Sequence, residues 1–216
     1  MATDTDIKNS MNAMYRWTRH IYDASRKYYL LGRDCLIDNL DAQGGERICE
    51  VGCGTARNLI KMARLYPDAG FYGLDASDEM LKTAQQSVEK ANVKVQLEQA
   101  FSQKFQPETL FNLDKPFDKI VFSYALSIIP PWQDSIDHAL DLLPKGGEMH
   151  IVDFGDMAQQ PEWFRKLIFW WLKLFHVYHK PEVLEHLKQL ALDGKGTLEL
   201  SDLYKGYAYL AIFKKT

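Results

Sequence analysis

The chain has 216 residues, of which 46% are hydrophobic and 25% are charged, and its formal net charge is -3. This length suits one domain with a small appendage, and the slight acidic excess gives no reason to expect a nucleic-acid partner. The three cysteines, Cys35, Cys49 and Cys53, show no paired spacing, which favours a reducing cytoplasm over a disulfide framework.

The apolar runs predict neither a signal peptide nor a transmembrane helix. The first residues are acidic and contain no apolar stretch, unlike a signal peptide. The longest apolar run near the C-terminus, residues 167–172, is too short to span a bilayer. We therefore predict a cytoplasmic protein, monomeric or homodimeric, with a peripheral position at the inner membrane face as an alternative.

The N-terminal region divides into a flexible tail, residues 1–10, and a helical lid, residues 11–40. The lid contains no proline and repeats its apolar residues with helical spacing, which predicts two helices with a break near Ser25 or Gly32. Its tyrosines lie near arginines and suit the lid of a pocket, although each ring could simply pack on the core. They are Tyr15, Tyr22, Tyr28 and Tyr29.

A glycine turn follows the first predicted strand. Residues 47–51 form a short, mostly apolar run that ends at Gly52 and Gly54, and residues 56–66 show helical spacing. Residues without bulky side chains let the turn backbone approach a ligand, and the next helix points free N–H groups at it. The segment predicts a site for a nucleotide-like ligand; the alternative is an ordinary tight turn.

The second predicted strand, residues 71–74, ends in an acid that could accept both hydroxyls of a ribose. Asp75 lies 23 residues after Gly52, which fits either NAD or S-adenosylmethionine. Glu50 beside the turn would repel a pyrophosphate but suits a ligand with an ammonium and a sulfonium. Arg57 occupies the position where a dinucleotide fingerprint has glycine or alanine. The pattern therefore favours S-adenosylmethionine.

Strands and helices alternate up to the fifth strand, which predicts a doubly wound parallel sheet. Ser77 is a predicted N-cap for a helix that runs to about Ala91. Asp153, near the tip of the fifth strand, could meet a cationic substrate or simply cap a neighbouring loop. The remaining elements are strands at residues 94–97, 116–124 and 148–154 and a helix at residues 134–143.

The last two predicted strands, residues 197–203 and 207–213, are joined by a connection so short that they must pair antiparallel. The predicted fold is therefore α/β, with a doubly wound, mostly parallel, seven-stranded sheet and an N-terminal helical cap. The sheet domain covers residues 41–216.

A helical insertion, residues 157–192, separates the fifth strand from this hairpin. Residues 163–175 are apolar nearly all round the helical wheel, which predicts a helix either packed between other elements or lying in a lipid interface. Tryptophan with lysine and arginine favours the bilayer surface. His176 and His179 have the spacing of a metal pair, but no third ligand accompanies them, so we predict no metal.

Glu50–Gly54 resembles motif I of the class I S-adenosylmethionine-dependent methyltransferases, Glu/Asp-x-Gly-x-Gly. Residues 73–77 and 123–126 resemble motifs II and IV of the same enzymes. The resemblance implies strand order 3-2-1-4-5-7-6, an N-terminal helix that closes over the methyl donor, and Gln99 where relatives carry an acid that reads the adenine. It implies donor-binding roles for Tyr15, Arg33, Glu50, Gly52, Gly54, Asp75, Ala76, Met80, Gln99, Ala100 and Ser123.

A closer resemblance is to the bacterial betaine-lipid methyltransferases, and it rests on residues 15–16, 19–23, 26–34, 49–58, 163–165 and 175–177. These enzymes trimethylate the amine of diacylglyceryl-homoserine. We expect Tyr22 and Tyr124 to flank that amine as catalytic residues, because tyrosine faces stabilise a quaternary ammonium. Substrate-binding candidates are Tyr28, Tyr29, Asp153 and His176.

Three rivals to this interpretation differ in activity or class. Within the enzyme class, the acceptor could be phosphatidylethanolamine or a soluble small amine. From another class, the chain could be a catalytically idle S-adenosylmethionine-binding regulatory module, although its full donor motif and tyrosine-rich lid argue against that. A nicotinamide oxidoreductase is the third, and tight NAD binding would identify it.

Overall fold

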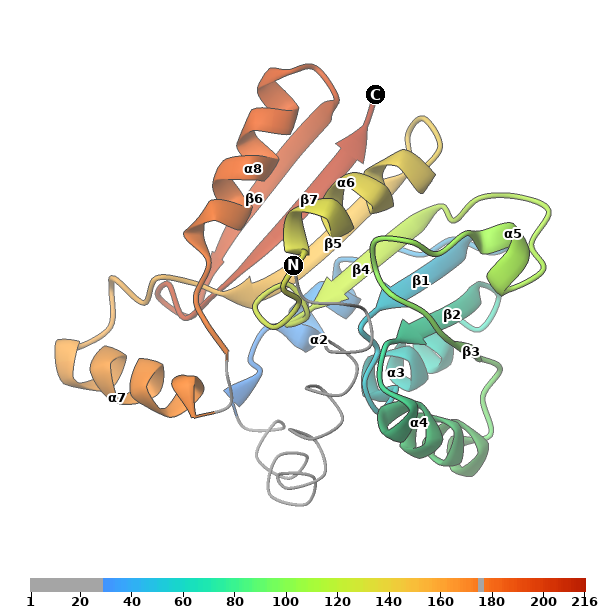
Figure 1. Ribbon diagram of the computed structural model, residues 1–216, viewed down its shortest axis with the longest axis horizontal. Helices are drawn as coiled ribbons and strands as arrows, with labels where there is room; N and C mark the ends of the chain where they lie inside the picture. Colours follow the sequence, from blue (N-terminus) through green and yellow to red (C-terminus); the bar gives the residue numbers. More distant parts are fainter. Residues whose placement is uncertain (1–28, 175–176) are drawn as a thin grey trace.

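The computed structural model describes residues 29–174 and 177–216, which form one seven-stranded sheet in the order β3-β2-β1-β4-β5-β7-β6 (Figure 1). This order confirms the predicted fold. The strands are β1 (Arg47–Val51), β2 (Gly70–Asp75), β3 (Gln96–Gln99), β4 (Lys119–Ser123), β5 (Glu148–Phe154), β6 (Gly196–Leu203) and β7 (Ala208–Lys215).

Strands β1 to β5 pair in parallel, and β7 pairs antiparallel with both β5 and β6. The predicted antiparallel hairpin is therefore confirmed. β3 begins at Gln96, two residues later than predicted, where it first pairs with Tyr72 of β2. β4 ends at Ser123, since the following Tyr124 has φ 56° and cannot continue a strand.

Helices cover both faces of the sheet and make a three-layer sandwich (Figure 1). One face packs against α2 (Arg33–Asp38), α3 (Arg57–Leu65) and α4 (Asp78–Ala91). The other packs against α5 (Pro107–Leu110), α6 (Trp132–Leu142) and α8 (Pro181–Leu192). The insertion also contains α7 (Glu162–Lys173). None of the helices in these described ranges is long and apolar enough to cross a membrane.

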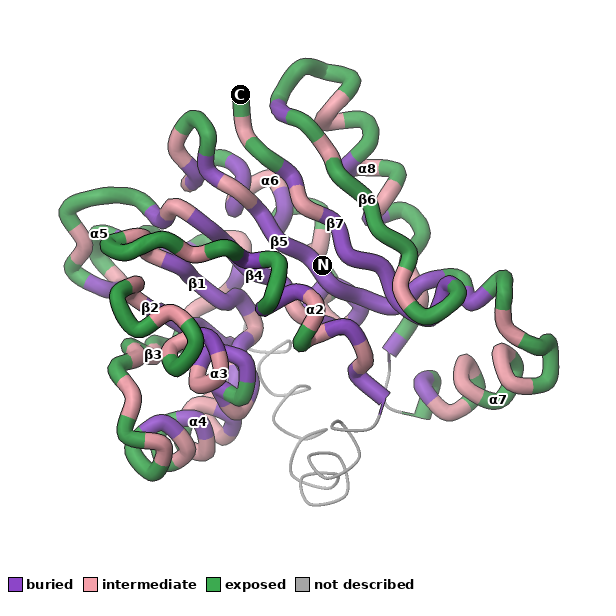
Figure 2. The backbone as a smooth tube through the Cα atoms, turned by 180° about the vertical axis from the view of Figure 1, so that it is seen from behind, coloured by how far each residue is buried: buried purple, intermediate pink, exposed green. Residues whose placement is uncertain are grey.

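The central strands are apolar on both faces, and successive residues supply two separate cores. Ile48 and Val121 belong to the cluster under α2, α3 and α4, whereas Cys49 and Phe122 belong to the cluster under α6 and α8. Figure 2 shows the buried residues concentrated along β4, β5 and β7. Because side chains alternate along a strand, such continuous apolar runs are what a sheet covered on both faces requires.

Helix α4 begins and ends as its sequence predicts. The Ser77 side chain accepts a hydrogen bond from the Met80 N–H at 3.4 Å, which makes it the predicted N-cap. Asp78 and Glu79 occupy the first turn, where the helix dipole favours negative charge. Asn92 ends the helix in the left-handed conformation, with φ 53°.

Helix α7 has one packed side and one exposed side, so it is not enclosed between other elements. Leu172 is buried, and four more apolar side chains pack against the core cluster: Phe164, Ile168, Phe169 and Trp171. The opposite side carries Trp163 (69% exposed), Leu167, Trp170 (59% exposed) and Leu174. The helix projects beyond the carboxyl end of β5 (Figure 1). The helical wheel of α7 is therefore apolar nearly all round because one side packs against the core and the other side is exposed.

Candidate functional site

The candidate site lies at the carboxyl ends of β1, β2 and β4, where the strand order reverses direction. Open α/β sheets bind ligands outside these ends, because the loops there part to leave a crevice. Two pockets meet at Gly52. The polar pocket is lined by Leu30, Arg33, Glu50, Gly52, Cys53, Gly54, Thr55, Arg57, Asn58, Thr83, Ser87 and Ser123. The apolar pocket lies between the segments that follow β3 and β4.

The predicted glycine turn follows β1 directly. The N–H groups of Gly52 and Cys53 donate to the Leu74 carbonyl at 2.8 and 3.0 Å, which ties the turn to the end of β2. Gly52 has φ 72°, and a Cβ added there would lie 2.9 Å from the Cβ of Ala125. The position therefore requires glycine both for its backbone conformation and for its space.

Asp75 holds the turn from the neighbouring strand. Its Oδ2 accepts from the Gly54 N–H and its Oδ1 from the Ser77 N–H, each at 2.9 Å. The residue is 5% exposed and lines the apolar pocket. A carboxylate oxygen has two lone pairs, so one such oxygen can accept more than one hydrogen bond. The arrangement gives a fixed carboxylate at the junction of the two pockets, suited to a pair of vicinal hydroxyls.

Glu50 is fixed at the floor of the polar pocket by the first turn of α3. The Asn58 side-chain amide donates to its Oε1 at 2.7 Å, in a buried contact. The hydroxyl of Ser123, at the end of β4, is buried and has no hydrogen-bond partner within the described part of the chain. These two groups give the pocket an acidic floor and an available hydroxyl.

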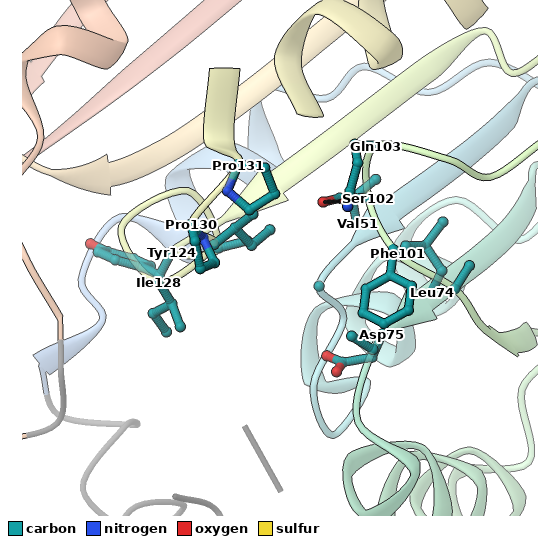
Figure 3. A pocket seen from close by; sticks show the side chains of 15 residues that line it. Val51, Leu74, Asp75, Phe101, Ser102, Gln103, Tyr124, Ile128, Pro130 and Pro131 are labelled. Carbon is teal, nitrogen blue, oxygen red and sulfur yellow. Dashed lines mark hydrogen bonds between the residues drawn. The ribbon is translucent and has the colours of Figure 1, made fainter. Parts of the chain in front are cut away.

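The apolar pocket lies between two loops that face each other (Figure 3). Phe101 and Ser102 come from the segment after β3, and Ile128, Pro130 and Pro131 come from the loop between β4 and α6. Sequence reasoning missed all five, since their residue types carry no motif; only their position after strand ends could have indicated them. The full lining is Val51, Gly52, Leu74, Asp75, Ala76, Ala100, Phe101, Ser102, Gln103, Tyr124, Ala125, Ile128, Ile129, Pro130 and Pro131.

Tyr124 lines this pocket with its ring but directs its hydroxyl elsewhere. The phenol donates to the Leu31 carbonyl, and the ring packs edge-on against Phe154 at 4.6 Å. The residue is almost completely buried. Burial, with Asp153 nearby, raises the pKa of Tyr124 well above its usual value, so the phenol stays protonated. Any role for Tyr124 beside a substrate therefore uses the ring face.

Asp153 caps a neighbouring loop, which is the alternative weighed for it from the sequence. Its Oδ2 accepts from the Ser127 N–H at 3.0 Å and its Oδ1 from the Phe154 N–H at 2.8 Å. It is buried and belongs to neither pocket lining. A substrate contact for Asp153 stays a prediction.

Burial raises the pKa of Asp153 from its ordinary 3.8 to about 6, which predicts a pH-dependent stability. Because the folded pKa lies above the unfolded one, the folded state binds the proton more tightly. The stabilisation is complete below about pH 4 and is lost as the pH rises through about 6; it amounts to about 2 to 3 kcal/mol.

As the pH rises from about 4 through about 6, we expect the unfolding free energy of wild type minus that of Asp153→Asn to fall by about 2 to 3 kcal/mol. Urea titrations at a series of pH values would measure it, and groups elsewhere cancel in the difference. A difference independent of pH would mean that Asp153 titrates normally.

The other predicted donor residues lie in different surroundings. Ala76 and Ala100 line the apolar pocket, and Arg33 lines the polar pocket. The Gln99 side chain donates to the Ala76 carbonyl at 3.0 Å, and Met80 is 4% exposed in the core. Neither Gln99 nor Met80 lines the polar or the apolar pocket, so their donor contacts stay predictions.

Four predicted residues lie outside the described ranges: Tyr15, Tyr22, Tyr28 and His176. Tyr29 is buried, with its ring edge-on to Trp171 at 4.5 Å, and its carbonyl accepts from the Tyr207 hydroxyl at 2.8 Å. Tyr29 therefore packs against α7 and is tied to the residue before β7. Within residues 29–174 and 177–216, no three His, Cys, Asp or Glu side chains group to hold a metal ion.

A family model described as a methyltransferase domain matches residues 42–198. The chain therefore belongs to the methyltransferase-domain family and is an enzyme of that class.

Among curated relatives, the demethylmenaquinone methyltransferase of Geobacillus sp. (strain WCH70) is 25% identical over 95% of this chain and 85% of its own length. The demethylmenaquinone methyltransferase of Listeria welshimeri is 28% identical over 72% of this chain and 61% of its own. A putative methyltransferase of Invertebrate iridescent virus 6 is 23% identical over 63% of this chain, which spans about half, 48%, of that relative.

Solved structures share the fold at low identity. The plantazolicin methyltransferase BpumL, in complex with monoazolic desmethylPZN analog and SAH, superposes with a TM-score of 0.71 at 13% identity, over 99% of this chain and 97% of its own. The magnesium protoporphyrin IX methyltransferase ChlM from Synechocystis PCC 6803, with bound SAM, has a TM-score of 0.66 at 16% identity, over 100% and 99%. The sheet and its crossovers are therefore those of this class of enzyme.

Proposed function

We propose that this chain is an S-adenosylmethionine-dependent N-methyltransferase that converts the amine of a diacylglyceryl-homoserine head group to a betaine. The observation that carries the donor is the fixed pair of carboxylates around the glycine turn. Glu50 lies in the polar pocket and Asp75 in the apolar pocket, on opposite sides of Gly52. S-adenosylhomocysteine is the expected product of the donor.

The chain's residues fit this donor in charge and in shape. Asp75 would accept the ribose hydroxyls, and Ala76 and Ala100 would pack beside the adenine ring. Glu50 suits the ammonium of the methionine part, and the Ser123 hydroxyl has capacity for one more hydrogen bond. Gly52 leaves the room that a Cβ would fill. Tyr15 and Arg33 complete the proposed donor site.

The donor supplies an electrophilic methyl group on a sulfonium. The protein's task is then alignment, because a correctly placed amine lone pair attacks the methyl carbon while the carbon–sulfur bond breaks. The amine must first lose its proton to a carboxylate or to water. We assign the faces of Tyr22 and Tyr124 to the growing ammonium, where each aromatic face stabilises a cation by roughly 0.5 to 2 kcal/mol. Tyr28, Tyr29, Asp153 and His176 are proposed on the substrate side.

A lipid acceptor is favoured by the resemblance to betaine-lipid methyltransferases and by the exposed side of α7. Its residues Trp163, Leu167, Trp170 and Leu174 recur with helical spacing, and Lys166 and Lys173 lie on the same helix. Exposed tryptophan with lysine suits the headgroup region of an anionic bilayer. We propose that residues 163–175 hold a cytoplasmic protein at the inner membrane face.

This surface makes a direct prediction. The double substitution Trp163→Ser and Trp170→Ser should weaken binding to phosphatidylglycerol-containing vesicles by at least about tenfold. The reason is that two indole rings, which the bound protein would bury in the lipid, are lost. Both side chains are exposed, so the fold should survive. Co-sedimentation measures the binding. The matched control replaces two exposed leucines elsewhere, Leu65→Ser and Leu192→Ser. Equal vesicle binding by both double variants would contradict the α7 contact.

A second candidate acceptor is the ring carbon of a demethylmenaquinone-like quinol, favoured by the names of the curated relatives. It is also membrane-borne, so the α7 contact does not separate the two. Their chemistry does, since an amine yields a fixed positive charge and a quinol does not. Phosphatidylethanolamine and soluble amines are the remaining acceptors.

The test presents each acceptor to the enzyme separately in vesicles with labelled donor. We expect label in diacylglyceryl-homoserine, and mass spectrometry should find the trimethylated head group. Homoserine without its acyl chains should be a poor acceptor. Label confined to the quinol, to phosphatidylethanolamine or to free homoserine would replace the proposed acceptor with that one.

A further inference from the structure

The loop between β4 and α6, residues 124–131, forms one wall of the apolar pocket (Figure 3). Its residues Tyr124, Ile128 and Pro130 line the pocket on the side opposite Phe101 and Ser102, which follow β3. The carboxylates that we assign to the donor, Glu50 and Asp75, come from other strands. The loop carries Tyr124, which we assign to the ammonium of the acceptor, and it also borders the pocket lined by Asp75 and Ala76, which we assign to the donor. Its position therefore sets where the two reactants meet.

Lys180 lies immediately before α8, and its side chain holds this loop. Its Nζ donates to the Leu126 carbonyl at 2.8 Å and to the Ile129 carbonyl at 3.0 Å. A single ammonium thus satisfies two carbonyls of one loop, and hydrogen bonds from a charged donor are stronger than those between neutral groups.

Asp153 fixes the same loop through the residue between these carbonyls. It accepts from the Ser127 N–H at 3.0 Å. Burial lowers the pKa of Lys180, and the nearby Asp153 carboxylate opposes that change. Half-burying a lysine costs free energy of solvation, so the carbonyls and the carboxylate must offset it. A lysine that merely covered the surface would not be placed in this way.

The neighbour of Lys180 is itself fixed, which makes the anchor rigid. His179 Nδ1 is hydrogen-bonded to the Phe154 carbonyl at 3.0 Å, and its ring stacks on Phe169 of α7 at 6.0 Å. The backbone before α8 is therefore attached both to the end of β5 and to the helix of the insertion.

We propose that Lys180 is a positioning residue for methyl transfer, holding the β4–α6 loop so that the acceptor reaches the donor at a fixed place. The inference rests on the proposed function, because the loop is an acceptor wall only if an acceptor binds there. Lys180 acts through the loop's backbone and is assigned no contact with either reactant.

The test compares Lys180→Met, Lys180→Arg and a control, Lys188→Met, which removes an exposed charge from α8. Hydrogen exchange of the loop amides needs no acceptor. In Lys180→Met we expect residues 127–129 to exchange at least about tenfold faster, while residues 48–58 exchange as in wild type. Lys180→Arg should restore most of the protection, since its guanidinium can donate to both carbonyls. Lys188→Met should behave as wild type.

With an acceptor that wild type methylates, Lys180→Met should raise the acceptor KM or lower kcat by about tenfold. Unchanged exchange in the loop would overturn the anchor, as would equal acceleration in residues 48–58. If wild type methylates no lipid amine, the proposed function fails, yet hydrogen exchange of residues 127–129 still decides whether Lys180 holds the loop.

Discussion

Replacing Asp75 with alanine should weaken binding of S-adenosylmethionine and S-adenosylhomocysteine by about a hundredfold or more. Each lost hydrogen bond between a carboxylate and a ribose hydroxyl is worth about 1.5 to 3 kcal/mol. The carboxylate also holds the Gly54 and Ser77 N–H groups, so the turn that carries the donor loses two of its supports. Calorimetric titration measures the affinity directly.

The matched control is Asp193→Ala, which removes an exposed acid after α8. It should bind both ligands as wild type does. Circular dichroism and thermal unfolding identify the temperature range in which Asp75→Ala is still folded. A folded Asp75→Ala protein with wild-type affinity would remove Asp75 from the donor site.

The substitution Gly52→Ala should have a comparable effect for a different reason. An alanine at φ 72° costs about 1 to 2 kcal/mol, and its Cβ would lie 2.9 Å from that of Ala125. Either the turn or the loop after β4 must shift, and both belong to the pocket junction. We expect donor affinity to fall by at least about thirtyfold, with a loss of about 2 to 4 kcal/mol in unfolding free energy.

Two further variants separate backbone strain from the steric contact. Gly45 has φ 83° with no atom within 4 Å of an added Cβ, so Gly45→Ala should lose only the strain and keep donor affinity. Adding Ala125→Gly to Gly52→Ala removes the contact and should recover part of the affinity, measured against Ala125→Gly alone. If Gly52→Ala bound the donor normally, the close approach at this turn would have no functional meaning.

The sheet and the donor side were predictable because local patterns determine them. The run at residues 47–51 became β1 with the same bounds, and Ser77 became the N-cap of α4. Alternation of strands and helices allows few topologies, and the resemblance to class I methyltransferases supplied the strand order. Asp75 was found because the end of the second strand lies beside the turn after the first.

The acceptor side was not predictable, because it depends on contacts between distant segments. Nothing in the sequence around Lys180 indicates that it bonds to carbonyls at positions 126 and 129. Phe101 and Pro130 are far apart in the sequence, and they line one pocket because the sheet brings their two loops together. The wheel of α7 was apolar nearly all round, and sequence alone could not separate its packed side from its exposed side.

The most direct measurement incubates the purified chain with a lipid extract and S-adenosylmethionine labelled in the methyl group, followed by organic extraction and head-group analysis. We expect label in a chloroform-soluble lipid that carries a trimethylated homoserine head group. Label only in water-soluble products would contradict a lipid acceptor. Donor binding without transfer to any acceptor would indicate a non-catalytic binding module and would contradict the proposed function.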